Sequence, residues 1–285
     1  MKKGFTLVEL LIVMILIFLI VGAVLSIHLK SSELFKEGKE LSDVTEDARI
    51  AITTLDFVFS RWGMGVPCAN NTCIISDVLP YCNIPLSGNT LISPPTLPSD
   101  PMCIDTGTNG EEAVFYANLE GFGFVVNSTG TLADILSCRL DTSPTQNCYY
   151  IWRNGVVLNP SNNTFFPLSV PLNGTINGVD CINTTDPNVQ INAYTSGITL
   201  EPGDYITRVP YIIRIYIDNI NGTDWLMMKK IDLATACNNN EPAIKLAPVE
   251  SFNATVIGRA VKLIITFVNP KDPSKKITIE KIYSK

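Results

Sequence analysis

The chain has 285 residues, of which 46% are apolar and 17% are charged, and its formal net charge is −6. This balance is too polar for a polytopic membrane protein, and it fits one membrane segment attached to a folded domain. Residues 68–244 contain six basic and sixteen acidic side chains, whereas residues 245–285 contain eight basic and three acidic ones. Nucleic-acid binding needs clustered lysine and arginine, so the acidic central part argues against nucleic acid as a partner.

The N-terminus begins MKKGFTLVELL, with Lys2 and Lys3 ahead of Gly4, and an apolar run follows from Leu10 to Ile27. That run is about long enough to cross a bilayer at 1.5 Å per residue. The two lysines predict that the N-terminus stays on the cytoplasmic side. A secretory signal peptide carries its small residues after the apolar core and is removed with that core. Here the small residue comes first, so we expect the apolar helix to be retained.

The order KKG followed by FTLVELL resembles the leader of class III prepilins, which belong to the type IV pilin and pseudopilin superfamily. The resemblance implies that a prepilin peptidase cuts between Gly4 and Phe5 and methylates the new amine of Phe5. Glu9 matches the glutamate that, in this family, meets the N-terminal amine of a neighbouring subunit during assembly. A carboxylate at this depth is costly unless a partner charge is supplied, which agrees with that role. An incidental glutamate at the headgroup level is the alternative.

After Lys30 the pattern stays helical up to the first proline, Pro67, because apolar residues recur every three or four positions. These residues are Leu34, Gly38, Leu41, Val44, Ala48, Ile52, Leu55, Phe59 and Trp62. We predict a helix from Phe5 to about Arg61, roughly 85 Å long, that Gly63 and Gly65 terminate. By resemblance, its first half packs against equivalent helices in a filament, and its second half packs under the β-sheet of its own subunit.

Residues 48–65, with the sequence ARIAITTLDFVFSRWGMG, resemble the end of this helix in PilW and GspJ-type minor pilins. Residues 109–121 and the C-terminal segment are more loosely similar to strands of the same subgroup. The expected fold class is α+β, with a long N-terminal helix packed on an antiparallel β-sheet head that has disulfide-stapled loops. The expected parts are a leader (1–4), a transmembrane and filament-core helix (5–30), its amphipathic continuation (31–66) and an exported β-rich head (67–285).

Turn residues in the head predict three β-hairpins. The first spans residues 149–158 around Asn154-Gly155, and the second spans 206–233 around Asn221-Gly222-Thr223. The third pairs two strands within 257–283 across residues 269–276. Between Pro67 and Pro101 we expect a loop held by cysteines.

Eight cysteines follow the apolar segment, and none forms a CxxC pair, so zinc-ribbon spacing is absent. An even number in an exported domain predicts disulfides made in an oxidising compartment. The candidates are Cys68, Cys73, Cys82, Cys103, Cys138, Cys148, Cys181 and Cys237. Proximity favours Cys138 with Cys148 and some pairing within the first four, but the connectivity is not readable from sequence.

The head offers little catalytic chemistry, because the sole histidine is His28 at the exit from the apolar segment. Catalytic triads and histidine-ligated metal sites are therefore excluded from the head. Asp105-Thr106-Gly107 resembles half of an aspartic-protease motif without its second copy, so a loop turn is the simpler interpretation. Weak calcium candidates, whose spacing departs from an EF-hand loop, are Asp105, Asn109, Glu111 and Glu112. No other cofactor is expected.

Three tryptophans could form a stacking platform for carbohydrate or single-stranded nucleic acid. They are Trp62, Trp152 and Trp225. All three lie in helix or strand patterns, where packing in the core is the simpler interpretation.

The sequence therefore predicts a non-enzymatic structural subunit, a minor pilin or pseudopilin assembled through its N-terminal helix into a pilus or a secretion pseudopilus. The expected partners are other pilin or pseudopilin subunits, prepilin peptidase, the inner-membrane assembly platform and, before assembly, membrane lipid. We expect a single-pass protein of the cytoplasmic membrane with its head on the periplasmic or extracellular side, and later a cell-surface filament. A pilus-tip binding module for adhesion or DNA uptake, and a major pilin, remain the alternatives.

Overall fold

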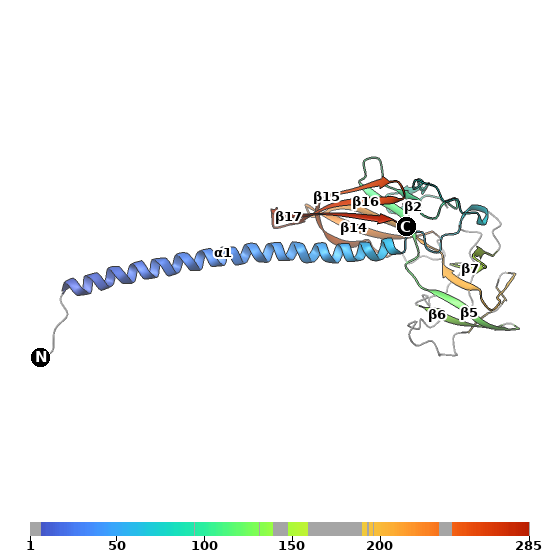
Figure 1. The fold of residues 1–285 in the computed structure, drawn as a ribbon, viewed down its shortest axis with the longest axis horizontal. Helices are drawn as coiled ribbons and strands as arrows, with labels where there is room; N and C mark the ends of the chain where they lie inside the picture. Colours follow the sequence, from blue (N-terminus) through green and yellow to red (C-terminus); the bar gives the residue numbers. More distant parts are fainter. Residues whose placement is uncertain are drawn as a thin grey trace.

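A computed structural model describes residues 7–93, 95–130, 132–138, 148–158, 190–192, 194–195, 197–233 and 241–284. One long helix is followed by two large antiparallel sheets and several short elements (Figure 1). The expected α+β class, with a long helix on antiparallel strands and disulfides in the loops, is confirmed.

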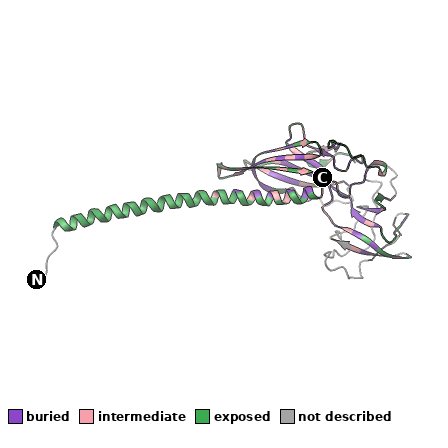
Figure 2. Ribbon diagram, viewed as in Figure 1, coloured by how far each residue is buried: buried purple, intermediate pink, exposed green. Residues whose placement is uncertain are grey.

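The helix α1 spans Leu7–Ser60, and most of it projects away from the head (Figure 1). Every residue of α1 before Glu40 is exposed, and burial begins only near the head (Figure 2). The buried residues recur at three- and four-residue intervals on one face of the helix, and they are Val44, Ala48, Ala51, Leu55, Val58 and Phe59.

The predicted apolar stripe is correct for Val44, Ala48, Leu55, Phe59 and Trp62, all of which are buried. Leu34, Gly38 and Leu41 lie in the same helix, as predicted, but are exposed, and Ile52 is only partly buried. The reason is that the head does not extend far enough along α1 to cover the first three positions.

A seven-stranded antiparallel sheet packs on α1, with the order β17-β16-β15-β14-β13-β4-β3. Its strands are β3 (Ile104–Asp105), β4 (Glu112–Ala117), β13 (Tyr211–Ile220), β14 (Thr223–Asp232), β15 (Ile244–Ile257), β16 (Ala260–Asn269) and β17 (Asp272–Ser284). The ring of Phe59 stacks on Tyr283 with centroids 4.1 Å apart and lies 4.6 Å from Phe115. Burial of each large apolar side chain contributes about 1.5–3 kcal/mol, so this shared core fixes the head on the helix.

A six-stranded sheet has the order β8-β7-β12-β5-β6-β9 and lies past the C-terminal end of α1 (Figure 1). Its strands are β5 (Phe122–Thr129), β6 (Leu132–Cys138), β7 (Tyr149–Arg153), β8 (Val156–Val157), β9 (Gln190–Asn192) and β12 (Tyr205–Arg208). The described residues also form two short ribbons and a 3-10 turn: β1 (Leu86–Ser87) with β2 (Thr90–Leu91), β10 (Tyr194–Thr195) with β11 (Ile198–Thr199), and η1 (Ala69–Asn71).

The first predicted hairpin is confirmed as β7 and β8, which are joined by Asn154-Gly155. Both turn residues have positive φ, 53° and 78°, as a type I′ turn requires. The second hairpin is also confirmed, as β13 and β14 around Asn221-Gly222, which have φ values of 54° and 81°.

Two hairpin boundaries differ from the prediction. Ile206 belongs to β12 of the six-stranded sheet, not to β13, because Pro210 separates the two strands and has no N–H to continue a ladder. The third hairpin is confirmed as β16 and β17, but its turn is tight and β17 already begins at Asp272.

Candidate functional site: the N-terminal helix

The first part of α1 combines an apolar composition with complete exposure. Within the described ranges, α1 is the one helix that is long and apolar enough to cross a membrane by length and composition, and none of its apolar window is buried inside the protein. Exposed side chains such as Leu19 and Phe18 need an apolar environment that the head does not supply.

Glu9 is the acidic residue in the first turn of α1, within this apolar part. A carboxylate there interacts favourably with the N-terminal end of the helix dipole. Gly4 and Phe5 lie outside the described residues, so cleavage between them stays a prediction from the sequence.

On the side of α1 turned away from the seven-stranded sheet, helical periodicity places Ile50, Thr53 and Phe57 along one line, here called the outer stripe. Ile50 and Phe57 are 55% and 45% exposed. The Thr53 hydroxyl donates to the backbone carbonyl of Arg49 at 2.8 Å, so its polar group is satisfied inside the helix. The outer stripe can therefore pack against another helix without leaving that hydroxyl unpaired.

Where α1 emerges from the head, the turn between β16 and β17 holds it. The side-chain amide of Asn269 donates to the backbone carbonyl of Glu40 at 3.2 Å. A notch beside this contact is lined by Asp43, Val44, Glu46, Asp47, Asn269, Pro270 and Lys271. Partial burial, and then the negative charges of Asp43 and Glu46, raise the pKa of Asp47 above its ordinary value.

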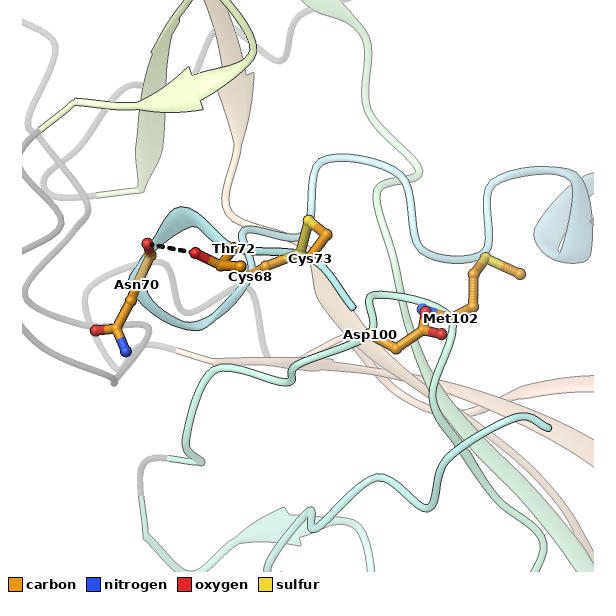
Figure 3. The surroundings of a disulfide bond; sticks show 6 residues. All are labelled: Cys68, Asn70, Thr72, Cys73, Asp100 and Met102. Atoms are coloured by element: carbon orange, nitrogen blue, oxygen red, sulfur yellow. Dashed lines mark hydrogen bonds between the residues drawn. A yellow bond between two sulfur atoms is a disulfide. The ribbon is translucent and has the colours of Figure 1, made fainter. Parts of the chain in front are cut away.

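Two disulfides close the loop that follows the helix. Cys68 is bonded to Cys73 (Figure 3), and Cys82 is bonded to Cys103. The predicted pairing within the first four cysteines, and the cysteine-held loop itself, are thereby confirmed.

Cys148 is also disulfide-bonded. The side chain of Cys138, and the whole of Cys181 and Cys237, lie outside the described part of the chain. The pairing of Cys138 with Cys148 therefore stays a prediction.

Asp105 accepts a hydrogen bond from the backbone N–H of Gly107 at 2.9 Å, which confirms the loop-turn interpretation of the Asp-Thr-Gly segment. The other calcium candidates take part in hydrogen bonds within the protein. The backbone N–H of Asn109 donates to the Glu111 carboxylate at 2.7 Å, and the Glu112 carboxylate accepts from the Arg214 guanidinium at 2.6 Å. No group of three His, Cys, Asp or Glu side chains in the described ranges is placed to hold a metal ion.

Two of the three tryptophans are core residues, as expected. The buried Trp62 indole donates to the Cys103 carbonyl at 3.2 Å, and the Trp152 indole donates to the Thr207 hydroxyl at 2.8 Å. Trp225 is partly buried, and the Lys245 ammonium lies over its ring.

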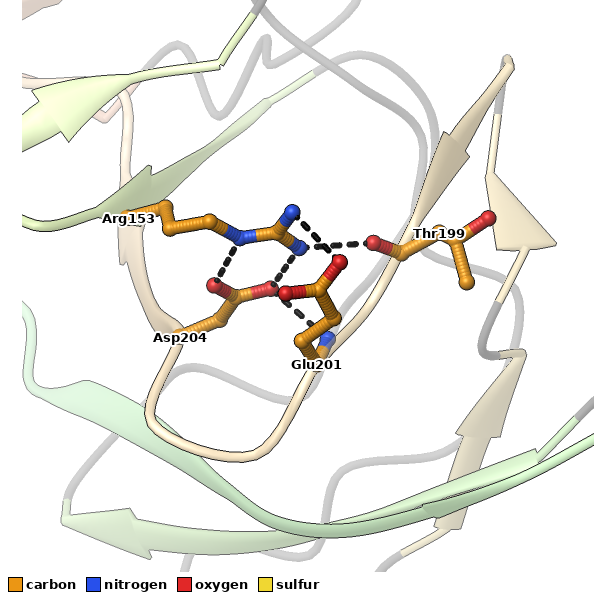
Figure 4. A network of polar contacts seen from close by, with 4 residues as sticks. All are labelled: Arg153, Thr199, Glu201 and Asp204. Carbon is orange, nitrogen blue, oxygen red and sulfur yellow. Dashed lines mark hydrogen bonds and ion pairs between the residues drawn. The ribbon is translucent and has the colours of Figure 1, made fainter.

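A polar cluster that sequence reasoning missed surrounds Arg153 (Figure 4). Its guanidinium donates to both carboxylate oxygens of Asp204 at 2.8 Å, to Glu201 at 2.7 Å and to the Thr199 carbonyl at 2.8 Å. The cluster ties the β7–β8 hairpin to the segment before β12. Its partners lie about fifty residues from Arg153, so no local pattern indicates the contact.

An exposed apolar helix that continues without a break into the core of a disulfide-bonded β-rich head defines a prepilin-like class of protein. Residues 1–25 match the family described as the prokaryotic N-terminal methylation motif. An uncharacterized protein of Aquifex aeolicus (strain VF5) is 32% identical over 289 residues, an alignment that covers 94% of each chain. No solved structure matches the chain. The chain belongs to the type IV pilin and pseudopilin superfamily, whose members are structural rather than enzymatic.

Proposed function

We propose that the chain is a minor pilin or pseudopilin. It is cut between Gly4 and Phe5, is held in the cytoplasmic membrane by Leu10–Ile27, and then enters a pilus or a secretion pseudopilus through the same helix. The observation that supports this proposal is the complete exposure of α1 from Leu7 to Lys39.

Energetics favour two successive environments for that segment. Each large apolar side chain gains about 1.5–3 kcal/mol when it leaves water, and Leu7–Ile27 is composed mainly of such residues. Lipid provides the environment before assembly, and the helices of other subunits provide it afterwards. Prepilin peptidase and the inner-membrane assembly platform are the partners that act between these two states.

The outer stripe provides a second contact with the filament. It lies on the part of α1 that is anchored to the head, on the side that the head leaves open. An apolar stripe with an internally satisfied threonine suits a neighbouring helix. A minor rather than a major subunit is supported by the similarity of residues 48–65 to the PilW and GspJ type and by the bulk that the six-stranded sheet adds.

The proposal is tested by intact mass and N-terminal sequencing of the protein from membranes and from sheared filaments of its own cells. We expect a chain that starts at methylated Phe5, present in filaments as a small fraction of the main subunit. Dominance in the filament fraction would make it a major pilin. A chain that keeps Met1 and stays in the membrane would overturn the proposal.

The outer stripe has its own test. The double variant I50K/F57K should reach the membrane normally but be depleted from sheared filaments, because two lysines cannot pack in an apolar helix interface. Thr45→Lys, at an exposed position of α1 outside the stripe, is the matched control and should assemble normally. Equal assembly of both variants would remove the stripe from the interface.

A further inference from the structure

The two edges of the seven-stranded sheet differ in how they are covered. At one edge, the loop held by disulfides covers β3, because the Ile104 N–H donates to the Pro80 carbonyl at 3.0 Å and the Cys82 N–H donates to the Ile104 carbonyl at 3.4 Å. At the other edge lies β17, which pairs with β16 and with no other described strand. In the described part of the chain, the backbone of residues 275–284 forms no hydrogen bond outside that pairing.

The direction of the backbone groups in β17 follows from a contact two strands away. The Ala254 N–H of β15 donates to the Gly110 carbonyl at 2.8 Å, so Ala254 turns its backbone groups away from β16. Its partner in β16, Leu263, therefore turns its own toward β17, where it lies opposite Lys281. Because this direction alternates along an antiparallel strand, the residues of β17 that turn their N–H and C=O groups outward are Lys276, Thr278, Glu280, Ile282 and Ser284.

The apolar core is incompletely covered along the same edge. Ile277, Ile279 and Tyr283 of β17 pack against the main apolar cluster but are only partly buried. An extended segment laid against β17 would remove more of these side chains from water, which contributes about 25 cal/mol per Å² of apolar area. The same segment would pair with the outward N–H and C=O groups, so the edge is complementary to a β-strand.

The usual protection of an exposed edge is missing from most of β17. Edge strands commonly avoid pairing with other chains through prolines, bulges and unpaired charges. Residues 276–284 contain no proline, and their pairing with β16 has no bulge. The lysines of β17 are paired with acidic side chains, Lys275 with Glu37, Lys276 with Glu250, and Lys281 with Asp56.

The strand β17 runs beside α1 and in the same direction (Figure 1). Lys275 near its start lies 3.7 Å from Glu37, and Lys281 near its end lies 3.1 Å from Asp56. Antiparallel pairing of this edge with the same edge of a second copy would point the two α1 helices in opposite directions. Two chains anchored in one membrane cannot adopt that arrangement, so the edge suits a segment other than a second β17.

We propose, on the basis of the function proposed above, that the open edge of β17 binds an extended segment of a neighbouring pilin or pseudopilin subunit as an eighth strand of the sheet. Other subunits supply the segment because β17 lies beside α1, which the proposed function places among their helices. The segment alternates in character, with apolar side chains beside Ile277 and Ile279 on the face that α1 covers. Its polar side chains lie beside Thr278 and Glu280 on the opposite face.

Hydrogen–deuterium exchange of the full chain, in detergent micelles and in sheared filaments, tests the inference. Peptic fragments that cover residues 275–284 report on the outward N–H groups of β17. We expect these groups to exchange at least about tenfold more slowly in filaments, because new hydrogen bonds protect them. Unchanged exchange in a chain that has entered filaments would overturn strand addition and leave the proposed function intact. Absence of the chain from every filament would contradict the proposed function, and the inference with it.

A pair of variants distinguishes strand addition from simple burial of the edge. T278P/I282P removes two outward N–H groups and leaves those that pair with β16, and prolines of this kind are tolerated in edge strands. T278A/I282A is the matched control, because it shortens the same side chains and keeps both N–H groups. T278P/I282P should enter filaments several-fold less than T278A/I282A, with a similar urea midpoint in micelles.

Equal entry of the two variants into filaments would overturn the inference. If T278P/I282P has a much lower urea midpoint than T278A/I282A, the exchange of the unaltered chain decides between the outcomes.

Discussion

The guanidinium of Arg208 lies 2.6 Å from the carboxylate of Asp232, with only 5% and 7% of the two side chains exposed. Arg208 ends β12 in the six-stranded sheet, and Asp232 ends β14 in the seven-stranded sheet. The guanidinium also stacks over the ring of Tyr211, 3.9 Å from its centroid. This ion pair joins the two sheets at the point where the chain passes from one to the other.

Asp232→Asn should lower the free energy of unfolding by about 3–5 kcal/mol, because it removes the carboxylate charge that compensates the buried guanidinium of Arg208. Urea unfolding of the full chain in detergent micelles, followed by tryptophan fluorescence, measures the loss. Glu250→Gln is the control, since it breaks the Glu250–Lys276 pair, whose side chains are 51% and 50% exposed, and should cost less than about 1 kcal/mol. Equal losses would show that the buried pair adds no more than a surface pair.

Glu9→Gln should reduce incorporation into filaments, because the amide keeps the size of the side chain but cannot neutralise an N-terminal amine. Comparison of the amounts in membranes and in sheared filaments measures the effect. Glu33→Gln, which changes an exposed glutamate of α1 beyond the apolar run, should leave assembly unchanged. Normal assembly of Glu9→Gln would exclude the proposed charge pairing.

The two disulfides should differ in their contribution to stability. The Cys82–Cys103 bond closes a loop with a sequence separation of 21, and the Cys68–Cys73 bond closes one with a separation of 5. Loop-closure entropy predicts losses of about 3 kcal/mol for C82A/C103A and about 2 kcal/mol for C68A/C73A. Denaturant unfolding of the two double variants shows which of them loses more free energy of unfolding. A larger loss for C68A/C73A would contradict the entropic explanation.

Asp47 and Asp272 should respond to pH in opposite ways. The pKa of Asp47 is raised, first by partial burial, so the charged carboxylate disfavours the folded state. The free energy of unfolding therefore falls as pH rises from the unfolded-state pKa of Asp47 through its folded-state pKa. Asp47→Asn should therefore raise the unfolding midpoint at pH 7, and the gain should disappear in acid.

The pKa of Asp272 is lowered by hydrogen bonds from the Ser274 hydroxyl and backbone N–H. Its stabilising effect is present above the unfolded pKa and is lost as pH falls through the folded pKa. Asp272→Asn should therefore lower the midpoint at pH 7 and have little effect in acid. Thermal unfolding at several pH values compares the two variants, and shifts of the same sign at pH 7 would contradict these pKa directions.

Several features could be predicted from the sequence because they depend on neighbouring residues. The apolar run and the three- and four-residue spacing determine one long helix, and the small residue before that run distinguishes a prepilin leader from a signal peptide. Asn154-Gly155 and Asn221-Gly222 determine two hairpin turns, because both residues of each pair accept the positive φ that such turns require.

Other features were decided only by the tertiary structure, because they depend on contacts between residues far apart in the chain. The length of the head determines that burial of α1 begins at Val44 rather than at Leu34. The partner of each cysteine, the pairing of Arg208 with Asp232, and the separation of β12 from β13 into different sheets follow from packing across the whole head. The place of the six-stranded sheet past the end of α1 has the same origin, since no local pattern specifies how one sheet docks on another.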